Sequence, residues 1–425
     1  MRMGDLLVRH IASPYGLTAA SSFLFLLAWT FPPGTYSYYL REPDLMFLDP
    51  ASLLYFLLCV FGFVVGLVIV DFCFPVSGFA RGKMELRVSP MWFLLLPVLA
   101  GTALTILSSV LLVRSNVDLL ELLLTAQGAQ LKSVGGLETS GSLGLASVAL
   151  MGIVWWATWR RQQLNLRGWR NFVVQSAIIV ATGSMLAAAT LKLARGELMP
   201  ILAGAAILFL LGKVIEGRLT AASVVRYAAA FVTLVAALFV GFSLLRGFVD
   251  FDSVLGDLSG YTIASYNRMA AILDGRMHYP FAGRGVYISS FVAFNDTFNK
   301  LVPINRLLSW PDFTTTWRSE FDAVWAAGLN GDFIWPGTFG YVFSDLGWFS
   351  PFLLFVYGLA TGWVWRSLKL GRTAGIVLYP WFAFCILFWF GTNYLLDTKV
   401  VVLFVDAVFL GIFEWLFGRR AATVS

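Results

Sequence analysis

Charged residues are scarce in this 425-residue chain, since Asp, Glu, Lys and Arg together make up 13% of it. Soluble globular proteins carry about 25%. The hydrophobic fraction is 59%, and long apolar runs recur along the whole sequence. This composition excludes an ordinary cytosolic enzyme, a disordered chain and a nucleic-acid-binding domain. It predicts an all-α polytopic protein whose main partner is the lipid bilayer.

Cysteine and histidine are rare as well. The three cysteines, Cys59, Cys73 and Cys385, lie in or beside apolar segments and show no CxxC spacing. They therefore indicate neither a disulfide framework nor a metal site. The two histidines, His10 and His278, are too few for a multi-histidine metal centre. We expect no metal and no cofactor.

Ten segments are long and apolar enough to cross a membrane, which takes about 20 residues. Their approximate ranges are 14–31, 51–71, 91–113, 143–159, 171–191, 198–212, 227–245, 348–365, 374–391 and 400–417. The first resembles a signal peptide, but it lacks a small-residue cleavage site and Phe31-Pro-Pro follows it. We therefore expect it to be retained as a span.

Basic residues are divided unequally between the loops on the two sides. With a cytoplasmic N-terminus, the cytoplasmic segments carry 17 Lys and Arg, whereas the short outer loops carry six. Basic residues collect in cytoplasmic loops. The sequence therefore predicts a multi-pass protein of the bacterial inner membrane with both termini in the cytoplasm.

Most of the mass outside the predicted spans lies in one loop. We predict seven spans in residues 1–245, a large periplasmic loop with short helices in 246–337, and three spans in 338–425. The large loop combines mixed charges with many aromatic residues, which marks it as the functional surface. A second outer loop, 114–142, has leucines at helical spacing and predicts an amphipathic helix on the outer membrane face.

The common catalytic motifs of soluble enzymes are missing from the sequence. The chain has no Walker motif, GxSxG or HExxH, and no cytoplasmic loop has paired carboxylates of the DxD type. The cytoplasmic loops are also too short to fold a nucleotide-binding domain. An activated substrate must then come from the membrane or from the outer side. Transporters, channels and enzymes that use lipid-linked substrates remain.

Arginine is concentrated on the predicted outer side. Its planar guanidinium stays charged and binds phosphate oxygens through two parallel hydrogen bonds. Gly283 and Gly285 would let backbone amides approach such a ligand closely. The alternative is that these arginines pair with loop carboxylates such as Asp274 and Asp296. The candidate substrate-binding residues are Arg195, Arg246, Arg268, Arg276, Arg284 and Arg306.

Three outer residues are candidates for proton transfer. Glu197 shares a short turn with Arg195, and His278 belongs to the residue type most often used for acid–base catalysis. Asp345 is the third, although its place at the head of a span also suits a helix N-cap. A further acid, Asp406, lies inside the last span, where an unpaired carboxylate is costly. It either pairs with a polar group on a neighbouring span or has a functional role.

A series of short elements surrounds the large loop. In chain order they are Arg268 with Gly275-Arg276, the step AGRGVY, Pro303 to Arg306, Pro336-Gly337 with Gly340, Asp345 with Gly347, and Gly358 or Gly362. Together with the RGE turn at Arg195, this order resembles the Wzy-type oligosaccharide repeat-unit polymerases, which include the O-antigen polymerases.

The resemblance implies a membrane glycosyltransferase that joins undecaprenyl-diphosphate-linked oligosaccharide units at the periplasmic face. A chain-length regulator protein is then a candidate partner. The arginines would stabilise the leaving diphosphate, and Glu197, His278 or Asp345 would accept the proton of the attacking hydroxyl. Two other functions stay open: an O-antigen ligase that transfers polymer to lipid A-core, and a lipid-linked oligosaccharide transporter or flippase.

Overall fold

A computed structural model describes residues 10–40, 42, 46–76, 78–79, 84–115, 121, 125, 145–164, 166–192, 195–216, 220–245, 252, 256, 259–294, 299, 302–331 and 333–420. The predicted amphipathic helix of residues 114–142 lies almost entirely outside the described residues, as does Arg246.

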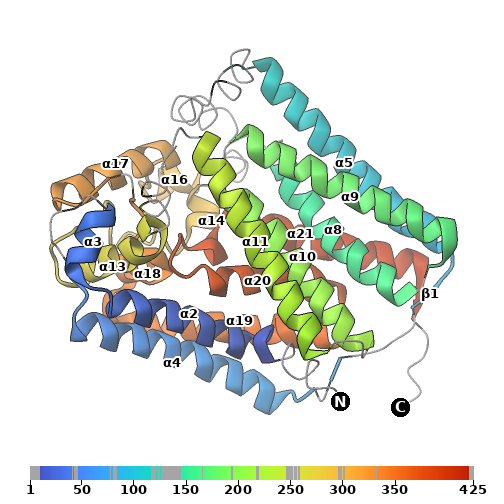
Figure 1. The fold of residues 1–425 in the computed structure, drawn as a ribbon, viewed down its shortest axis with the longest axis horizontal. Coiled ribbons are helices and arrows are strands. Elements are labelled where there is room, and N and C mark those ends of the chain that lie inside the picture. Colours follow the sequence, from blue (N-terminus) through green and yellow to red (C-terminus); the bar gives the residue numbers. More distant parts are fainter. Residues whose placement is uncertain are drawn as a thin grey trace.

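A long helix lies at each of the ten predicted apolar segments (Figure 1). These helices are α2 (Pro14–Trp29), α4 (Pro50–Cys73), α5 (Pro90–Ser115), α8 (Ala146–Leu164), α9 (Gly168–Leu191), α10 (Arg195–Glu216), α11 (Ala221–Leu245), α19 (Ser350–Lys369), α20 (Thr373–Leu387) and α21 (Thr398–Phe417). Six helical stretches among the described residues are long and apolar enough to cross a membrane. The described chain is thus the helical protein predicted from the sequence, with the long apolar helices of a multi-pass membrane protein.

Shorter helices gather at one end of the long ones (Figure 1, left). Those labelled there are α3 (Pro33–Leu40), α13 (Ser265–Leu273), α14 (Ser290–Ala293), α16 (Ile304–Leu307), α17 (Phe313–Ala326) and α18 (Gly337–Leu346). The remaining short helices are η2 (Gly260–Ala264), η3 (Gly347–Phe349) and η4 (Tyr394–Leu396). We call the part within residues 33–49 and 259–346 the short-helix head. It has a hydrophobic core of its own, around Met277, Val324 and Leu329.

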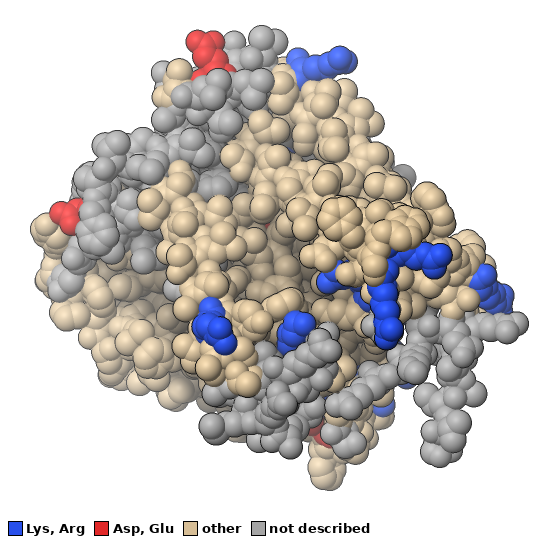
Figure 2. Space-filling model, turned by 45° about the vertical axis from the view of Figure 1, so that its right-hand side comes forward, with Lys and Arg blue, Asp and Glu red and all other residues tan. Residues whose placement is uncertain are grey.

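The opposite end joins segments that are far apart in the sequence. Strand β1 (Met84–Leu86) pairs antiparallel with β2 (Gly418–Arg420). The Asp71 carboxylate at the end of α4 accepts a hydrogen bond from Tyr15 at 2.8 Å and lies 3.4 Å from the Lys369 ammonium. Figure 2 shows Lys and Arg side chains gathered toward this end, beside a broad surface without charged side chains.

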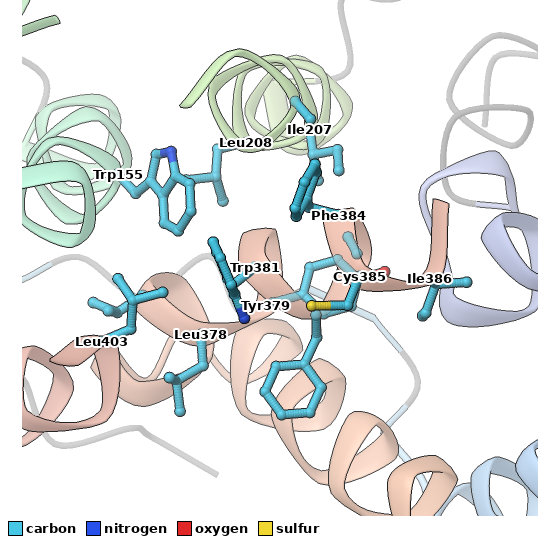
Figure 3. Close-up of a cluster of buried hydrophobic side chains, with 14 of the residues drawn as sticks. Trp155, Ile207, Leu208, Leu378, Tyr379, Trp381, Phe384, Cys385, Ile386 and Leu403 are labelled. Atoms are coloured by element: carbon cyan, nitrogen blue, oxygen red, sulfur yellow. The ribbon is translucent and has the colours of Figure 1, made fainter. Parts of the chain in front are cut away.

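Helix α20 lies at the centre of the bundle. Nearly every residue from Thr373 to Ile386 is buried. In Figure 3, side chains from α8 (Trp155), α10 (Leu208) and α21 (Leu403) converge around Trp381 of α20. A helix that is apolar on all sides is expected in such a central position.

Helices α4 and α19 approach each other at glycines. A Cβ atom on Gly66 would lie 2.3 Å from the carbonyl oxygen of Phe355, and one on Gly358 would lie 2.0 Å from that of Phe63. Small residues spaced four apart permit this backbone approach between membrane helices. Gly358, which contributes to the family resemblance, therefore has a role in helix packing.

Gly358→Ala is expected to lower the Tm of the purified protein, because overpacking a close contact typically costs about 1–3 kcal/mol. Gly411→Ala is the matched control: it makes the same change within α21, where the new Cβ would meet no atom within 4 Å. Thermal unfolding of both variants in one detergent measures the difference. A Gly358→Ala variant as stable as the Gly411→Ala variant would contradict the packing role.

Candidate functional site

Arg268 lies at the centre of a buried polar network in the short-helix head. Its side chain is fully buried and forms an ion pair with Glu42. The guanidinium also donates to the carbonyl oxygens of Phe333, Asn330 (2.9 Å) and Ala264 (3.2 Å), and to the Tyr36 hydroxyl (3.3 Å). Every N–H of the Arg268 guanidinium thus has a partner within the protein.

Glu42 connects three segments of the chain through the same network. Its carboxylate accepts hydrogen bonds from Arg268, from the Tyr36 hydroxyl and from the backbone N–H of Asn330, the last at 2.7 Å. Asn267 on α13 adds a 2.8 Å hydrogen bond to Tyr36. The network ties Tyr36 and Glu42 to the rest of the head, so Arg268 acts here as a structural residue.

Asp345 holds a loop against the junction of α18 and α19. Its carboxylate accepts hydrogen bonds from the backbone N–H groups of Gly285 (3.1 Å), Tyr287 (2.8 Å) and Ile288 (3.0 Å). The residue therefore does not cap the following helix, which was the alternative expected from its place in the sequence. It positions the loop that carries Arg284.

The loop that Asp345 holds lies at a surface marked by aromatic residues. Trp348, Phe349 and Phe352 follow directly at the start of α19, and all three side chains are exposed. Aromatic residues of this kind collect at the level of lipid headgroups. Arg284 is exposed on the loop that Asp345 holds, with its guanidinium 5.6 Å from the centre of the Phe281 ring.

The other predicted residues of the head are also exposed. The Arg276 side chain lies 3.3 Å from Asp274, which is one of the carboxylates considered as an alternative partner. His278 and Arg306 are exposed on the same domain. Exposure leaves these side chains free of the protein core and in reach of a ligand from outside.

A second cluster of charges lies where α10 and α21 begin. The Lys192 ammonium is 3.2 Å from the Glu197 carboxylate, and the Lys399 ammonium is 2.8 Å from that of Asp397. Electrostatic interaction also links Lys399 with Glu197. The cluster combines the predicted Glu197 with two lysines, which the sequence did not single out. Arg195 begins α10, but its side chain lies outside the described residues.

An apolar groove of about 310 Å³ borders this cluster. It is lined by Phe291, Leu378, Phe382, Leu395, Leu396, Val400, Val401 and Phe404. Leu396 directly precedes Asp397 and Val400 directly follows Lys399, so the groove lining continues along the chain into the charged cluster. The hydroxyl of Ser290 donates to the carbonyl oxygen of Leu396 at 2.7 Å, which connects the groove to the loop held by Asp345. Charged and apolar surfaces therefore adjoin.

Glu320 on α17 is a candidate that sequence reasoning missed. Its side chain is 6% exposed and lies near Tyr279, Tyr287 and Tyr341, whose rings are 5.2–5.4 Å apart. Burial raises the pKa of Glu320 to about 8. A carboxyl with such a pKa can accept or donate a proton near neutral pH. In the sequence, Glu320 resembles any surface residue of an amphipathic helix.

Glu320→Gln is expected to stabilise the protein above about pH 5. The raised pKa means that the folded protein keeps a proton which the unfolded chain releases above the ordinary value of 4.5. Stability of the wild type therefore falls as the pH rises from about 4.5 to about 8 and then levels off. The amide cannot ionise, so the Tm advantage of the variant should widen over this window.

Thermal unfolding at a series of pH values measures this effect. Asp322→Asn is the matched control, because Asp322 is an exposed carboxylate on the same helix. Equal pH dependence of the wild type and of Glu320→Gln would show that Glu320 is not a buried neutral acid.

Among the described residues, no three His, Cys, Asp or Glu side chains are grouped so that they could hold a metal ion. Comparisons of the chain with protein-family models, curated proteins and solved structures found no match. The candidate site combines a loop with exposed arginines, a cluster of lysines and carboxylates, and an apolar groove.

Proposed function

We propose that this protein is a membrane glycosyltransferase that polymerises undecaprenyl-diphosphate-linked oligosaccharide units at the periplasmic face of the inner membrane. The observation that carries the proposal is the adjacency of cationic side chains and an apolar groove. A polyprenyl diphosphate needs both, because its headgroup is anionic and its tail is a long hydrocarbon.

The headgroup would lie between the loop of Arg284 and the cluster of Lys192 and Lys399. Positioned cations can stabilise the charge that develops on a leaving diphosphate. Arg276 is the further arginine of this set, since it is exposed on the head. Arg268 is left out of the proposed binding set, because its guanidinium is fully engaged within the protein.

The attacking hydroxyl must lose its proton to a nearby base. Glu197 is the proposed base, because it lies in the charged cluster that borders the groove. His278 is a second candidate on the exposed face of the head. Asp345 is assigned a positioning role instead, since its carboxylate is held by three backbone N–H groups.

The membrane topology belongs to the same proposal. We infer ten spans, with the short-helix head in the periplasm and both termini in the cytoplasm. The pairing of β1 with β2 supports an even number of crossings between them, as does the excess of basic residues at that end.

Single cysteines test this topology in intact cells with a membrane-impermeant thiol reagent. In a Cys73→Ser background, Arg167→Cys is expected to stay unlabelled until the cells are permeabilised, whereas Thr315→Cys should label at once. The native Cys73 has to be removed because it is exposed. Labelling of Arg167→Cys in sealed cells would overturn the orientation.

A deletion strain tests the function, because the alternatives leave different products. Loss of a polymerase leaves single repeat units on the cell surface, and loss of a ligase leaves polymer on the lipid carrier. Loss of a flippase leaves no glycan outside. We expect single repeat units, and full-length chains again when the wild-type protein is supplied. Either of the other two products would replace the proposal by the corresponding function.

A further inference from the structure

Asp406 lies within α21, in the middle of the helix bundle. Its side chain is about nine-tenths buried, and its Oδ2 atom has no hydrogen-bond partner among the residues that the structure describes. The expected pairing with a polar group on a neighbouring span is therefore absent from this part of the chain. Unpartnered buried carboxylates are rare in membrane helices and are functional candidates.

The surroundings of Asp406 are apolar. A Cβ atom on Gly152 of α8 would lie 2.7 Å from its Oδ2 atom, and it would also contact the side chains of Leu403 and Val377. The carboxyl thus lies against the bare backbone of Gly152. Leu403, one turn earlier on α21, belongs to the cluster around α20 that Figure 3 shows.

The charged groups on the helices packed around Asp406 do not neutralise it. On α8, Arg160 pairs with Glu414 of α21, with an N···O distance of 2.6 Å. Glu414 lies eight residues beyond Asp406 on the same helix, which corresponds to about 12 Å. Lys399, at the start of α21, pairs with Asp397. Helix α20 has no Asp, Glu, Lys or Arg and contributes the titratable Tyr379 and Cys385.

An isolated ionised carboxylate in apolar surroundings is far costlier than the neutral acid. A metal cation would bind poorly beside Asp406, because Gly152, Val377 and Leu403 offer no side-chain oxygen to coordinate it. A proton needs no further ligand, since it converts the carboxylate into a neutral acid.

We propose that Asp406 is a proton-binding site inside the membrane-spanning bundle, and that loss of its proton loosens the packing of α21 against α8 and α20. Gly152 is the positioning residue for this site, because any larger side chain would displace the carboxyl. The inference rests on these contacts alone and holds whichever reaction the protein catalyses.

A hydrophobic carbodiimide tests the proposal on the purified full-length protein. The reagent reaches carboxyls from the bilayer and reacts with the protonated acid, whose proton moves to a reagent nitrogen as the oxygen bonds to its central carbon. Peptide mapping by mass spectrometry is expected to find the adduct at Asp406. Labelling should fall about tenfold per pH unit once the acid titrates.

Asp406→Asn should remove this label, and Asp71→Asn is the matched control because Asp71 is already paired. Amide hydrogen exchange across α21 should rise at high pH in the wild type and stay constant in Asp406→Asn. If the Asp406→Asn variant does not accumulate in the membrane, the test rests on the wild-type protein: which residue carries the label, and how the labelling changes with pH. An unmodified Asp406, or labelling that does not change with pH, would overturn the proposal.

Discussion

Replacing Arg268 by alanine is expected to deplete the protein from the membrane. The change leaves the Glu42 carboxylate buried without its cationic partner. Breaking one side of a buried ion pair typically costs about 3–5 kcal/mol, a large part of the stability of most proteins. Immunoblots of isolated membranes and the Tm of any purified protein measure the loss.

Removing both charges provides the control for this prediction. Arg268→Met combined with Glu42→Leu is expected to recover part of the lost abundance, because apolar replacements of a buried pair are often neutral. Recovery should remain incomplete, since Tyr36 and Asn330 lose a partner. Wild-type abundance and Tm for Arg268→Ala alone would contradict the structural role and return Arg268 to the substrate-binding candidates.

Replacing Arg284 by alanine is expected to abolish long glycan chains without changing protein abundance. The exposed guanidinium contributes little to stability, but it would stabilise the leaving diphosphate. Losing one such donor typically lowers the rate by about 100- to 1000-fold. Arg284→Lys should rescue poorly, because an ammonium is a point charge and cannot bind two oxygens at once. Arg276→Ala is expected to act in the same direction.

Chain length on gels and the rate of the reconstituted enzyme measure these effects. Arg318→Ala is the matched control, since Arg318 is an exposed arginine of α17 outside the proposed site. Normal chains from Arg284→Ala at normal abundance would remove this loop from the site. The search would then move to the cluster of Lys192 and Lys399.

The ten long helices follow from local properties of the sequence. Hydropathy over about 20 residues determines whether a segment can cross a membrane, and each predicted range contains a helix with nearby bounds. The central place of α20 is consistent with its uniformly apolar composition. The sheet of β1 and β2 was not predicted, because each strand has only three residues and its partner lies more than 300 positions away.

Residue type alone indicated which side chains could bind a substrate or transfer a proton. It did not indicate which residues these side chains contact in the folded protein. Arg268 and Arg284 look equivalent in the sequence, yet one is buried against Glu42, which lies 226 positions away, and the other is exposed. Glu320 and Asp322 likewise share a helix, and only the packing of three tyrosines distinguishes them.

The sequence by itself determined the class of protein and the positions of the long apolar helices. Each depends on composition or on periodicity within a few turns. Only the tertiary structure decided that Asp345 holds a loop, that Lys399 interacts electrostatically with Glu197, and that the Asp406 Oδ2 atom lies against Gly152 with no hydrogen-bond partner among the described residues. Partners and burial depend on contacts between distant segments, and those contacts arise only when the helices pack.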